Sequence, residues 1–266
     1  MTTLELMSSR PARANVEVLV LAAARIDGAP SLLTDGIITE DLDVGALATA
    51  LSAVGFTGEL DEVARVPSGA LGPDMTADCV LVVGTGTDPG PGDATALGAT
   101  RAGSLKRAAG CAARTLSGSG SAAFLLPADR PDDLVAVAEG ALVGAYAWSG
   151  RVPAPTPPLE RIVVATTLAG SEEGDAAMTH ASVLSETTTL VRDLVNEPPN
   201  RLTPAVFAER ARAIADEAGL EVEVLQEALL RERGFGGIIG VGQGSVHPPS
   251  LVRVSWVPDR SAQRIA

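Results

Sequence analysis

The sequence predicts an α/β protein in three parts: an N-terminal layered domain over residues 1–172, a linker helix over 173–198 and the incomplete start of a second α/β domain over 199–266. In the first part, short apolar runs of strand length alternate with helical patterns. Near-continuous apolar runs are typical of strands that are covered on both faces. Their alternation with helices favours a mixed, largely parallel sheet with helical crossovers.

The N-terminal part is expected to hold four main strands and three helices. The strands are predicted at Val16–Ala22, Cys79–Val83, Ala122–Leu126 and Ile162–Thr167, with a shorter one within Thr57–Val66. The helices are predicted at Val44–Val54, Ala94–Ala113 and Asp132–Trp148. The last helix follows Pro131, and its two leading aspartates complement the positive end of a helix dipole. The proline-rich segment Arg151–Pro158 is expected to be a loop.

The linker helix is expected to begin in the acidic segment Ser171–Asp175 and to continue to about Val195. Apolar residues recur in it at three- and four-residue steps, which predicts a buried face. That face comprises Leu184, Thr187, Val191 and Leu194. The segment NEPPN at Asn196–Asn200 must end the helix, because adjacent prolines remove amide donors and disfavour helical geometry before them.

The last part begins with a helix, since Thr203 can cap it and Pro204 suits its first position. Its predicted buried stripe is Phe207, Ala211, Ile214 and Ala218, and Gly219 ends it. A strand at Leu220–Leu225, a short helix at Glu227–Arg233, a glycine-rich stretch at Gly234–Ser245 and a strand at Leu251–Val257 follow. So few elements make a poor independent domain. We expect an open sheet edge and an uncovered apolar face, which would promote aggregation.

Charge and composition exclude several classes of function. The net charge is −13 and the pI is near 4.6, with no basic run, so nucleic acid and anionic membranes are excluded as partners. The N-terminus has no apolar signal core, and no apolar run approaches the ~20 residues of a membrane span. Cys79 and Cys111 are expected to be buried, reduced thiols. The sequence therefore predicts a soluble, cytoplasmic protein.

No residue recommends itself as catalytic, cofactor-binding or metal-ligating. His180 has no histidine or acid at the fourth following position, and His247 lies in a proline loop. No serine lies in a G-x-S-x-G elbow. The scattered carboxylates are expected to be solvated rather than to form a metal cluster. They include Asp41, Asp43, Glu172, Glu173, Asp175, Glu221 and Glu223.

Two glycine-rich segments are candidate anion sites. Gly84–Gly92 follows a strand and precedes a helix, as a phosphate cradle would. It matches neither G-x-G-x-x-G nor a P-loop, because Pro89 replaces a glycine and no Lys-Ser/Thr pair follows. Gly240–Ser245 precedes a strand, so its glycines are expected to permit close backbone approach. A plain turn is favoured at Gly84–Gly92, and nucleotide binding stays open.

Three segments in the C-terminal part resemble the cytosolic leucyl aminopeptidase family of di-zinc exopeptidases. The first is RDLVNEPPNRLTP at Arg192–Pro204, where the family has R-x-L-x-N-x-P-x-N-x-x-x-P. The second is the strand Gly219–Leu225 with the helix Glu227–Gly234. The third is GGIIGVGQGSVHPPSLV at Gly236–Val252. Their order and spacing agree with the family, whereas the N-terminal part is similar in architecture only.

The resemblance implies a cytoplasmic, hexameric enzyme that releases N-terminal amino acids from peptides with two divalent ions, zinc or manganese. The family's ligands and catalytic groups, two lysines among them, lie in later motifs of the type V-G-K-G-x-x-x-D-S/T-G-G and N-x-D-A-E-G-R. Residues 258–266 lead up to the first of these, and the only lysine, Lys106, lies in the other domain. We therefore expect no catalytic, cofactor or metal residue here and no activity of this chain alone. The alternatives are a non-catalytic module that binds a nucleotide or small anion, and a structural subunit that co-assembles with a full-length enzyme.

Overall fold

The computed structural model describes residues 2–8, 15–34, 42–70, 75–87, 100–150 and 156–256. The chain divides into two compact units, Met1–Val191 and Arg192–Ala266. Among the described residues, no helix combines the length and the apolar character that crossing a membrane requires. The three-part division at residues 172 and 198 stays a prediction.

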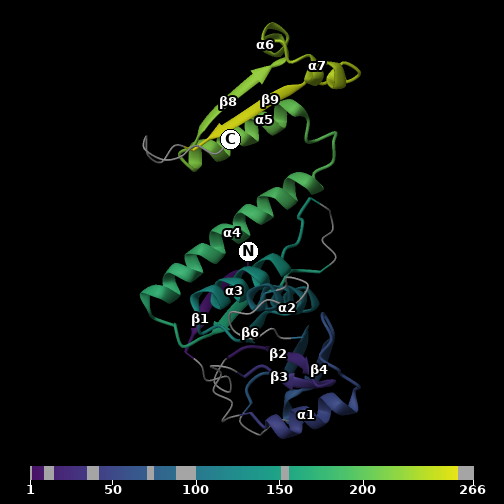
Figure 1. Ribbon diagram of the computed structural model, residues 1–266, viewed down its shortest axis with the longest axis vertical. Coiled ribbons are helices and arrows are strands. Elements are labelled where there is room, and N and C mark those ends of the chain that lie inside the picture. Colours follow the sequence, from purple (N-terminus) through teal and green to yellow (C-terminus); the bar gives the residue numbers. More distant parts are fainter. Residues whose placement is uncertain are drawn as a thin grey trace. The chain divides into compact units, whose positions relative to one another are not determined.

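The first unit is built on one seven-stranded sheet (Figure 1). Its strands lie in the order β1-β7-β6-β2-β5-β4, and β3 pairs with β2. All pairs are parallel except β2–β3 and β4–β5, so the predicted mixed, largely parallel sheet is confirmed. The strands are β1 (Thr3–Met7), β2 (Val18–Ile26), β3 (Ala29–Leu32), β4 (Val63–Pro67), β5 (Cys79–Gly86), β6 (Ser121–Leu125) and β7 (Arg161–Ala165).

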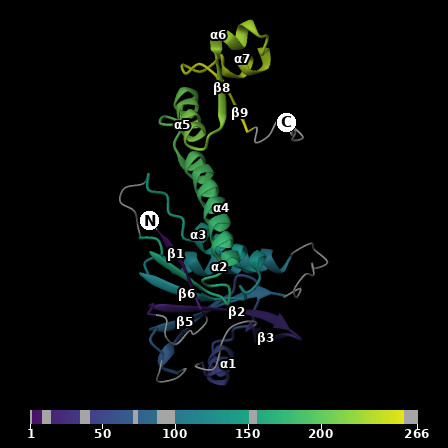
Figure 2. The ribbon, with the colours of Figure 1, turned by 90° about the vertical axis from the view of Figure 1, so that its left-hand side faces the viewer.

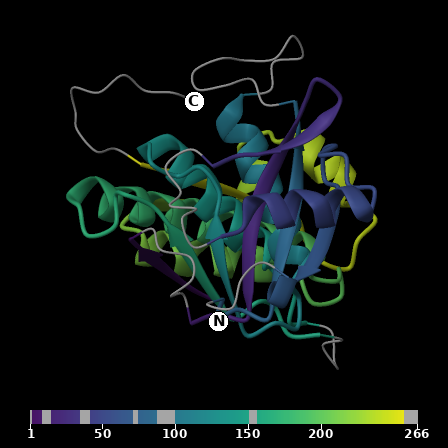
Figure 3. The ribbon, with the colours of Figure 1, turned by 90° about the horizontal axis from the view of Figure 1, so that it is seen from below.

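Helices cover both faces of this sheet. Helix α1 (Val44–Ala53) lies on one face, while α2 (Arg101–Thr115) and α3 (Pro131–Gly144) lie on the other (Figure 2, Figure 3). Alternate residues of each strand point to opposite faces, so the sheet has two separate cores. One is built around Phe124 with α2 and α3, and the other receives Leu47 and Leu51 of α1. Burial on both faces explains the near-continuous apolar strands. A short 3₁₀ turn, η2 (Ser68–Ala70), follows β4.

Two strands and several boundaries differ from the sequence-based expectation. β1 (TLELM) was missed because it lies at the edge of the sheet, where half-exposed polar residues interrupt the apolar pattern. β3 was not predicted because Pro30 interrupts its strand pattern. Asp27 and Gly28 nevertheless form the positive-φ turn that a hairpin requires. Helix α2 begins at Arg101, with Thr100 as its cap, and residues 94–99 of the predicted helix lie outside the described residues.

Helix α4 (Glu172–Asn196) is the predicted long helix, but the predicted buried face is wrong. The buried residues are Gly174, Ala177, Ala181 and Ser185, whereas Leu184, Thr187 and Val191 are exposed. Small residues occupy the buried face of α4 because they allow the helix backbone to lie close to its neighbours. A Cβ atom on Gly174 would lie 2.3 Å from the Leu168 carbonyl oxygen.

The second unit holds an antiparallel pair of strands with a helix on it. Its elements are α5 (Pro204–Glu217), β8 (Glu221–Gln226), α6 (Glu227–Glu232), α7 (Gly236–Gly242) and β9 (Ser250–Ser255). The glycine-rich stretch forms a helix, α7, where we expected closely approaching backbone segments. Only Gly242 is crowded, by the ring of Pro249, while Gly236, Gly237, Gly240 and Gly244 have open space at the Cβ position.

The buried stripe predicted for α5 is also wrong in part. Ala208 and Ala215 are the buried residues of this helix, while Phe207 is 41% exposed and Ala218 is exposed. The helix therefore contacts the strands through alanines, and its larger apolar side chains are only partly covered.

Candidate functional site

The carboxyl ends of β2 and β5 are where an α/β sheet would offer a ligand site. The loop 57–62, between α1 and β4, lies against β5 there. The Gly84 amide donates to the Glu62 carbonyl (2.7 Å), the Gly86 amide donates to the Gly58 carbonyl (3.0 Å), and the Asp61 amide donates to the Gly84 carbonyl (3.1 Å). The amides of Gly84 and Gly86 thus donate to the protein's own backbone.

Close packing explains the glycines at the end of β5 and in the loop against it. A Cβ atom at Gly84 would lie 1.8 Å from the Glu59 carbonyl oxygen, so no other residue fits there. Gly58 and Gly86 have φ angles of +78° and +70°, which side-chain-bearing residues rarely adopt. Gly84–Gly86 form the end of β5 and not the plain turn that we expected there, and their close packing favours a structural role over nucleotide binding. Residues 88–92 of the candidate cradle lie outside the described residues.

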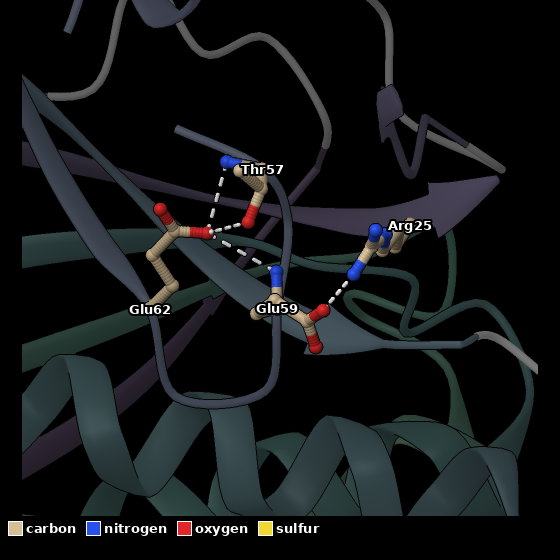
Figure 4. A network of polar contacts seen from close by, with 4 residues as sticks. All are labelled: Arg25, Thr57, Glu59 and Glu62. Carbon is tan, nitrogen blue, oxygen red and sulfur yellow. Dashed lines mark hydrogen bonds and ion pairs between the residues drawn. The ribbon is translucent and has the colours of Figure 1, made fainter. Parts of the chain in front are cut away.

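A network of polar side chains holds the same loop in place (Figure 4). One carboxylate oxygen of Glu62 accepts hydrogen bonds from the Thr57 amide (2.9 Å), the Thr57 hydroxyl (2.8 Å) and the Glu59 amide (3.1 Å). Arg25, near the end of β2, forms an ion pair with Glu59. Both carboxylates therefore bond to groups of the protein itself, and the network holds the loop 57–62 in place.

A second polar cluster joins this loop to α2. Arg107 donates to both carboxylate oxygens of Asp61, with its shortest contact at 2.6 Å. That hydrogen bond lowers the pKa of Asp61. Burial, and then the nearby Asp61 charge, raise the pKa of the Cys111 thiol, so it stays protonated at neutral pH and is a poor nucleophile. Both Cys111 and Cys79 are half-buried, not fully buried as we expected.

Lys106 lies in this region and forms a structural ion pair. Its Nζ atom is 2.6 Å from Glu139 of α3. A hollow of about 470 Å³ lies beside the pair, between α2 and α3, and includes Arg107 and Arg114 in its lining. Two of these three cations are paired, Lys106 with Glu139 and Arg107 with Asp61. Sequence reasoning could not have found these pairs, because their partners are 33 and 46 residues apart.

The histidines and the remaining carboxylates are distributed over both units. His180 and His247 are both exposed. Asp43 caps α1 by accepting from the Ala46 amide (2.9 Å), and Asp41 lies outside the described residues. The acids of the first turn of α4, Glu172, Glu173 and Asp175, are exposed as expected.

The carboxylates of β8 differ from each other. Glu221 is exposed, as expected, but Glu223 is half-buried and forms ion pairs with Arg233 (3.1 Å) and Arg253 (3.0 Å). Across the described part of the chain, no group of three or more histidine, cysteine, aspartate or glutamate side chains could hold a metal ion. The carboxylates described above thus take part in helix caps, loop hydrogen bonds and ion pairs with arginine or lysine.

Two family models match the chain, in sequential order. The N-terminal domain of the cytosol aminopeptidase family matches residues 30–149, and the catalytic domain of the same family matches residues 189–266.

Curated relatives match over nearly the whole chain. A probable cytosol aminopeptidase of Leifsonia xyli is 39% identical over 99% of this chain and 49% of its own length. That of Rhodococcus jostii is 38% identical over 94% of this chain and 48% of its own length. The chain therefore spans about half the length of the curated relatives that it matches.

Solved structures agree on the fold. The bottromycin maturation enzyme BotP is 28% identical, with a TM-score of 0.66, over 92% of this chain and 47% of its own; a second structure of that enzyme contains Mn. A mutant of tomato leucine aminopeptidase has a TM-score of 0.71 at 18% identity, over 96% of this chain and 50% of its own, and shows likeness of fold alone.

Proposed function

Because the chain belongs to the cytosol aminopeptidase family, we propose that it is the N-terminal portion of a leucyl aminopeptidase, a metallo-exopeptidase that releases N-terminal amino acids from peptides. The observation that carries the proposal is the order of the two matches. The N-terminal domain over 30–149 precedes the catalytic domain over 189–266, and relatives align across both. On this proposal, the chain supplies the N-terminal domain and the first elements of the catalytic one.

We further propose that these 266 residues do not contain the reaction centre. The family resemblance implies two lysines in motifs that follow the matched segments, and the sequence has one lysine. Lys106 lies on α2 of the first unit and is paired with Glu139, which gives it a structural role. On this proposal, residues 189–266 supply structural elements of the catalytic domain and none of its catalytic residues.

The family implies two divalent ions, zinc or manganese, which would polarise the peptide carbonyl and lower the pKa of a water molecule. The described residues do not fit such a centre. Two ions need several converging carboxylates, and among the described residues no group of three or more histidine, cysteine, aspartate or glutamate side chains is placed to hold a metal ion. We therefore assign the ions to the full-length enzyme and to no residue of this chain.

The remaining proposals follow from the family. Peptides are the substrates of the full-length enzyme, the assembly is a hexamer, and the location is the cytoplasm, in keeping with relatives described as cytosol aminopeptidases. The acidic net charge supports the absence of nucleic-acid and membrane partners. A structural subunit that co-assembles with a full-length enzyme is the second candidate, favoured by partly covered apolar side chains on α5.

Hydrolysis of a leucine anilide tests the proposal. The purified chain, with its mass verified, is assayed with added Zn²⁺ or Mn²⁺, and the Leifsonia xyli relative is the positive control. We expect turnover from the relative and none from the chain. Turnover by the chain that a chelator abolishes would contradict the proposed absence of a reaction centre.

A further inference from the structure

One side of helix α2 combines glycines with cations. Four positions recur there at steps of four, three and four residues, which places them on one face of the helix. They are Gly103, Arg107, Gly110 and Arg114. Helix α3 packs closely beside α2 through its own glycines, since a Cβ atom on Gly144 would lie 2.3 Å from the Gly110 carbonyl oxygen. The long basic side chains of α2 therefore surround a surface that has almost no side chains of its own.

The hollow of about 470 Å³ between α2 and α3 lies on this surface. Its lining carries three cations, Lys106, Arg107 and Arg114, and one carboxylate, Asp61. Glycines and Val143 make up the rest of the lining. The volume falls within the roughly 300–1,000 Å³ of pockets that hold small molecules. The lining is therefore large enough for a small ligand and has an excess of positive charge.

The cations of the hollow can turn toward an incoming anion at low cost. The side chains of Lys106 and Arg107 are 46% and 58% exposed, and exposed ion pairs contribute little to stability. Arg114 is exposed and forms no ion pair with any carboxylate of the described residues. The hydrogen bond from Arg107 lowers the pKa of Asp61 most, and the Arg114 charge lowers it further, so both guanidinium groups lie within electrostatic reach of one point.

We propose that the hollow between α2 and α3 binds the phosphate group of a small phosphorylated molecule, with Arg107 and Arg114 as donors to its oxygens and Lys106 as a third cation. Planar guanidinium groups match phosphate oxygens in pairs, and an ammonium group adds a compact charge. The net charge of −13 repels polyanions, but salt screens charges beyond about 10 Å, so a small anion responds to the lining alone. The site lies wholly in the first unit and does not depend on the proposed peptidase function.

Amide NMR of the full 266-residue chain tests the proposal. Inorganic phosphate and glycerol phosphate are titrated at low salt, and sodium chloride at equal ionic strength is the reference.

Three variants change the charge by one unit each. Arg114→Gln removes a cation of the lining and breaks no ion pair among the described residues. Asp61→Asn removes the carboxylate of the lining and releases Arg107, and asparagine tolerates the φ of +64° at this position. Arg130→Gln, at an exposed residue before α3 and outside the lining, is the matched control. Thermal melts check the fold of each variant.

We expect saturable shifts in the amides of α2 and α3 with both probes, and the ester should bind at least as tightly as inorganic phosphate. The Kd should rise about fivefold in Arg114→Gln and fall about fivefold in Asp61→Asn, and it should not change in Arg130→Gln. Damage to the fold would weaken binding in both lining variants, so opposite directions identify the charge of the lining as the cause. Equal shifts with chloride, the same Kd in all variants, or binding of the inorganic ion without the ester would overturn the proposal.

Discussion

Replacing Gly84 by alanine tests whether this glycine serves packing or ligand binding. The added Cβ atom would lie 1.8 Å from the Glu59 carbonyl oxygen, where ordinary contacts begin at about 3.4 Å, so the loop 57–62 must move by more than 1 Å. The move would break the hydrogen bonds of Gly84 with the Glu62 carbonyl and the Asp61 amide, at about 1 kcal/mol each. With a further ~1 kcal/mol of overpacking, we expect a loss of about 3 kcal/mol in the free energy of unfolding.

Thermal and urea unfolding measure this loss. The assay uses a Trp256→Phe background, so that fluorescence reports Trp148 in the first unit alone. For a unit of this size the Tm should fall by roughly 6 to 12 °C. Gly69→Ala is the matched control, since its Cβ position is open, and it should stay within about 0.5 kcal/mol of the parent. A Gly84→Ala variant as stable as this control, but deficient in nucleotide binding, would refute the packing argument.

Three further predictions concern the first unit. Gly140→Ala should destabilise it by about 2 kcal/mol in urea unfolding, because the Cβ atom would lie 2.2 Å from the Lys106 carbonyl oxygen; a change under about 0.5 kcal/mol would contradict the close α2–α3 contact. Asp43→Ala should cost about 1 kcal/mol in the same assay, through loss of the α1 cap, and Asp43→Asn should recover most of it. Because Arg107 holds the pKa of Asp61 below 3.8, the pair stabilises the fold above that pH and the contribution is lost as the pH falls through the lowered value. The acid-induced fall in Tm should therefore be smaller in Arg107→Gln, though only slightly, since both side chains are more than a third exposed; an unchanged acid profile would contradict the pairing.

The central strands could be predicted from the sequence because both of their faces are buried. β2, β5, β6 and β7 each present a nearly continuous apolar run. That pattern can be recognised without knowing which strands and helices lie beside each strand. The edge strand β1 and the hairpin strand β3 could not be found in this way, because half-exposed edges and a proline weaken the pattern.

Helix faces were harder to predict because hydropathy ranks large side chains above small ones. In α4 and α5 the contacts are made by glycine, alanine and serine, which let the backbones approach closely. The larger apolar residues of α5, Phe207 and Ile214, are only partly covered. The error in the predicted stripe thus has a physical cause, the partial cover on that side of the helix.

Some of the polar contacts join residues that are close in the sequence, and others join residues that are far apart in it. The cap at Asp43 and the exposed acids of α4 depend on neighbouring residues and were within reach of sequence reasoning. The pairs Asp61–Arg107 and Lys106–Glu139 join elements that only the folded sheet brings together. The family resemblance rests on short motifs in the second unit, and the comparisons confirm it over both units.

Native mass spectrometry of the purified chain with Mn²⁺ or Zn²⁺ tests most directly the claim that this chain is a scaffold without the family's reaction centre. The intact Leifsonia xyli relative, titrated in parallel, is the positive control. We predict two ions bound per chain for the relative and no stoichiometric binding for the 266-residue chain. Two ions bound per 266-residue chain at micromolar metal would contradict the account.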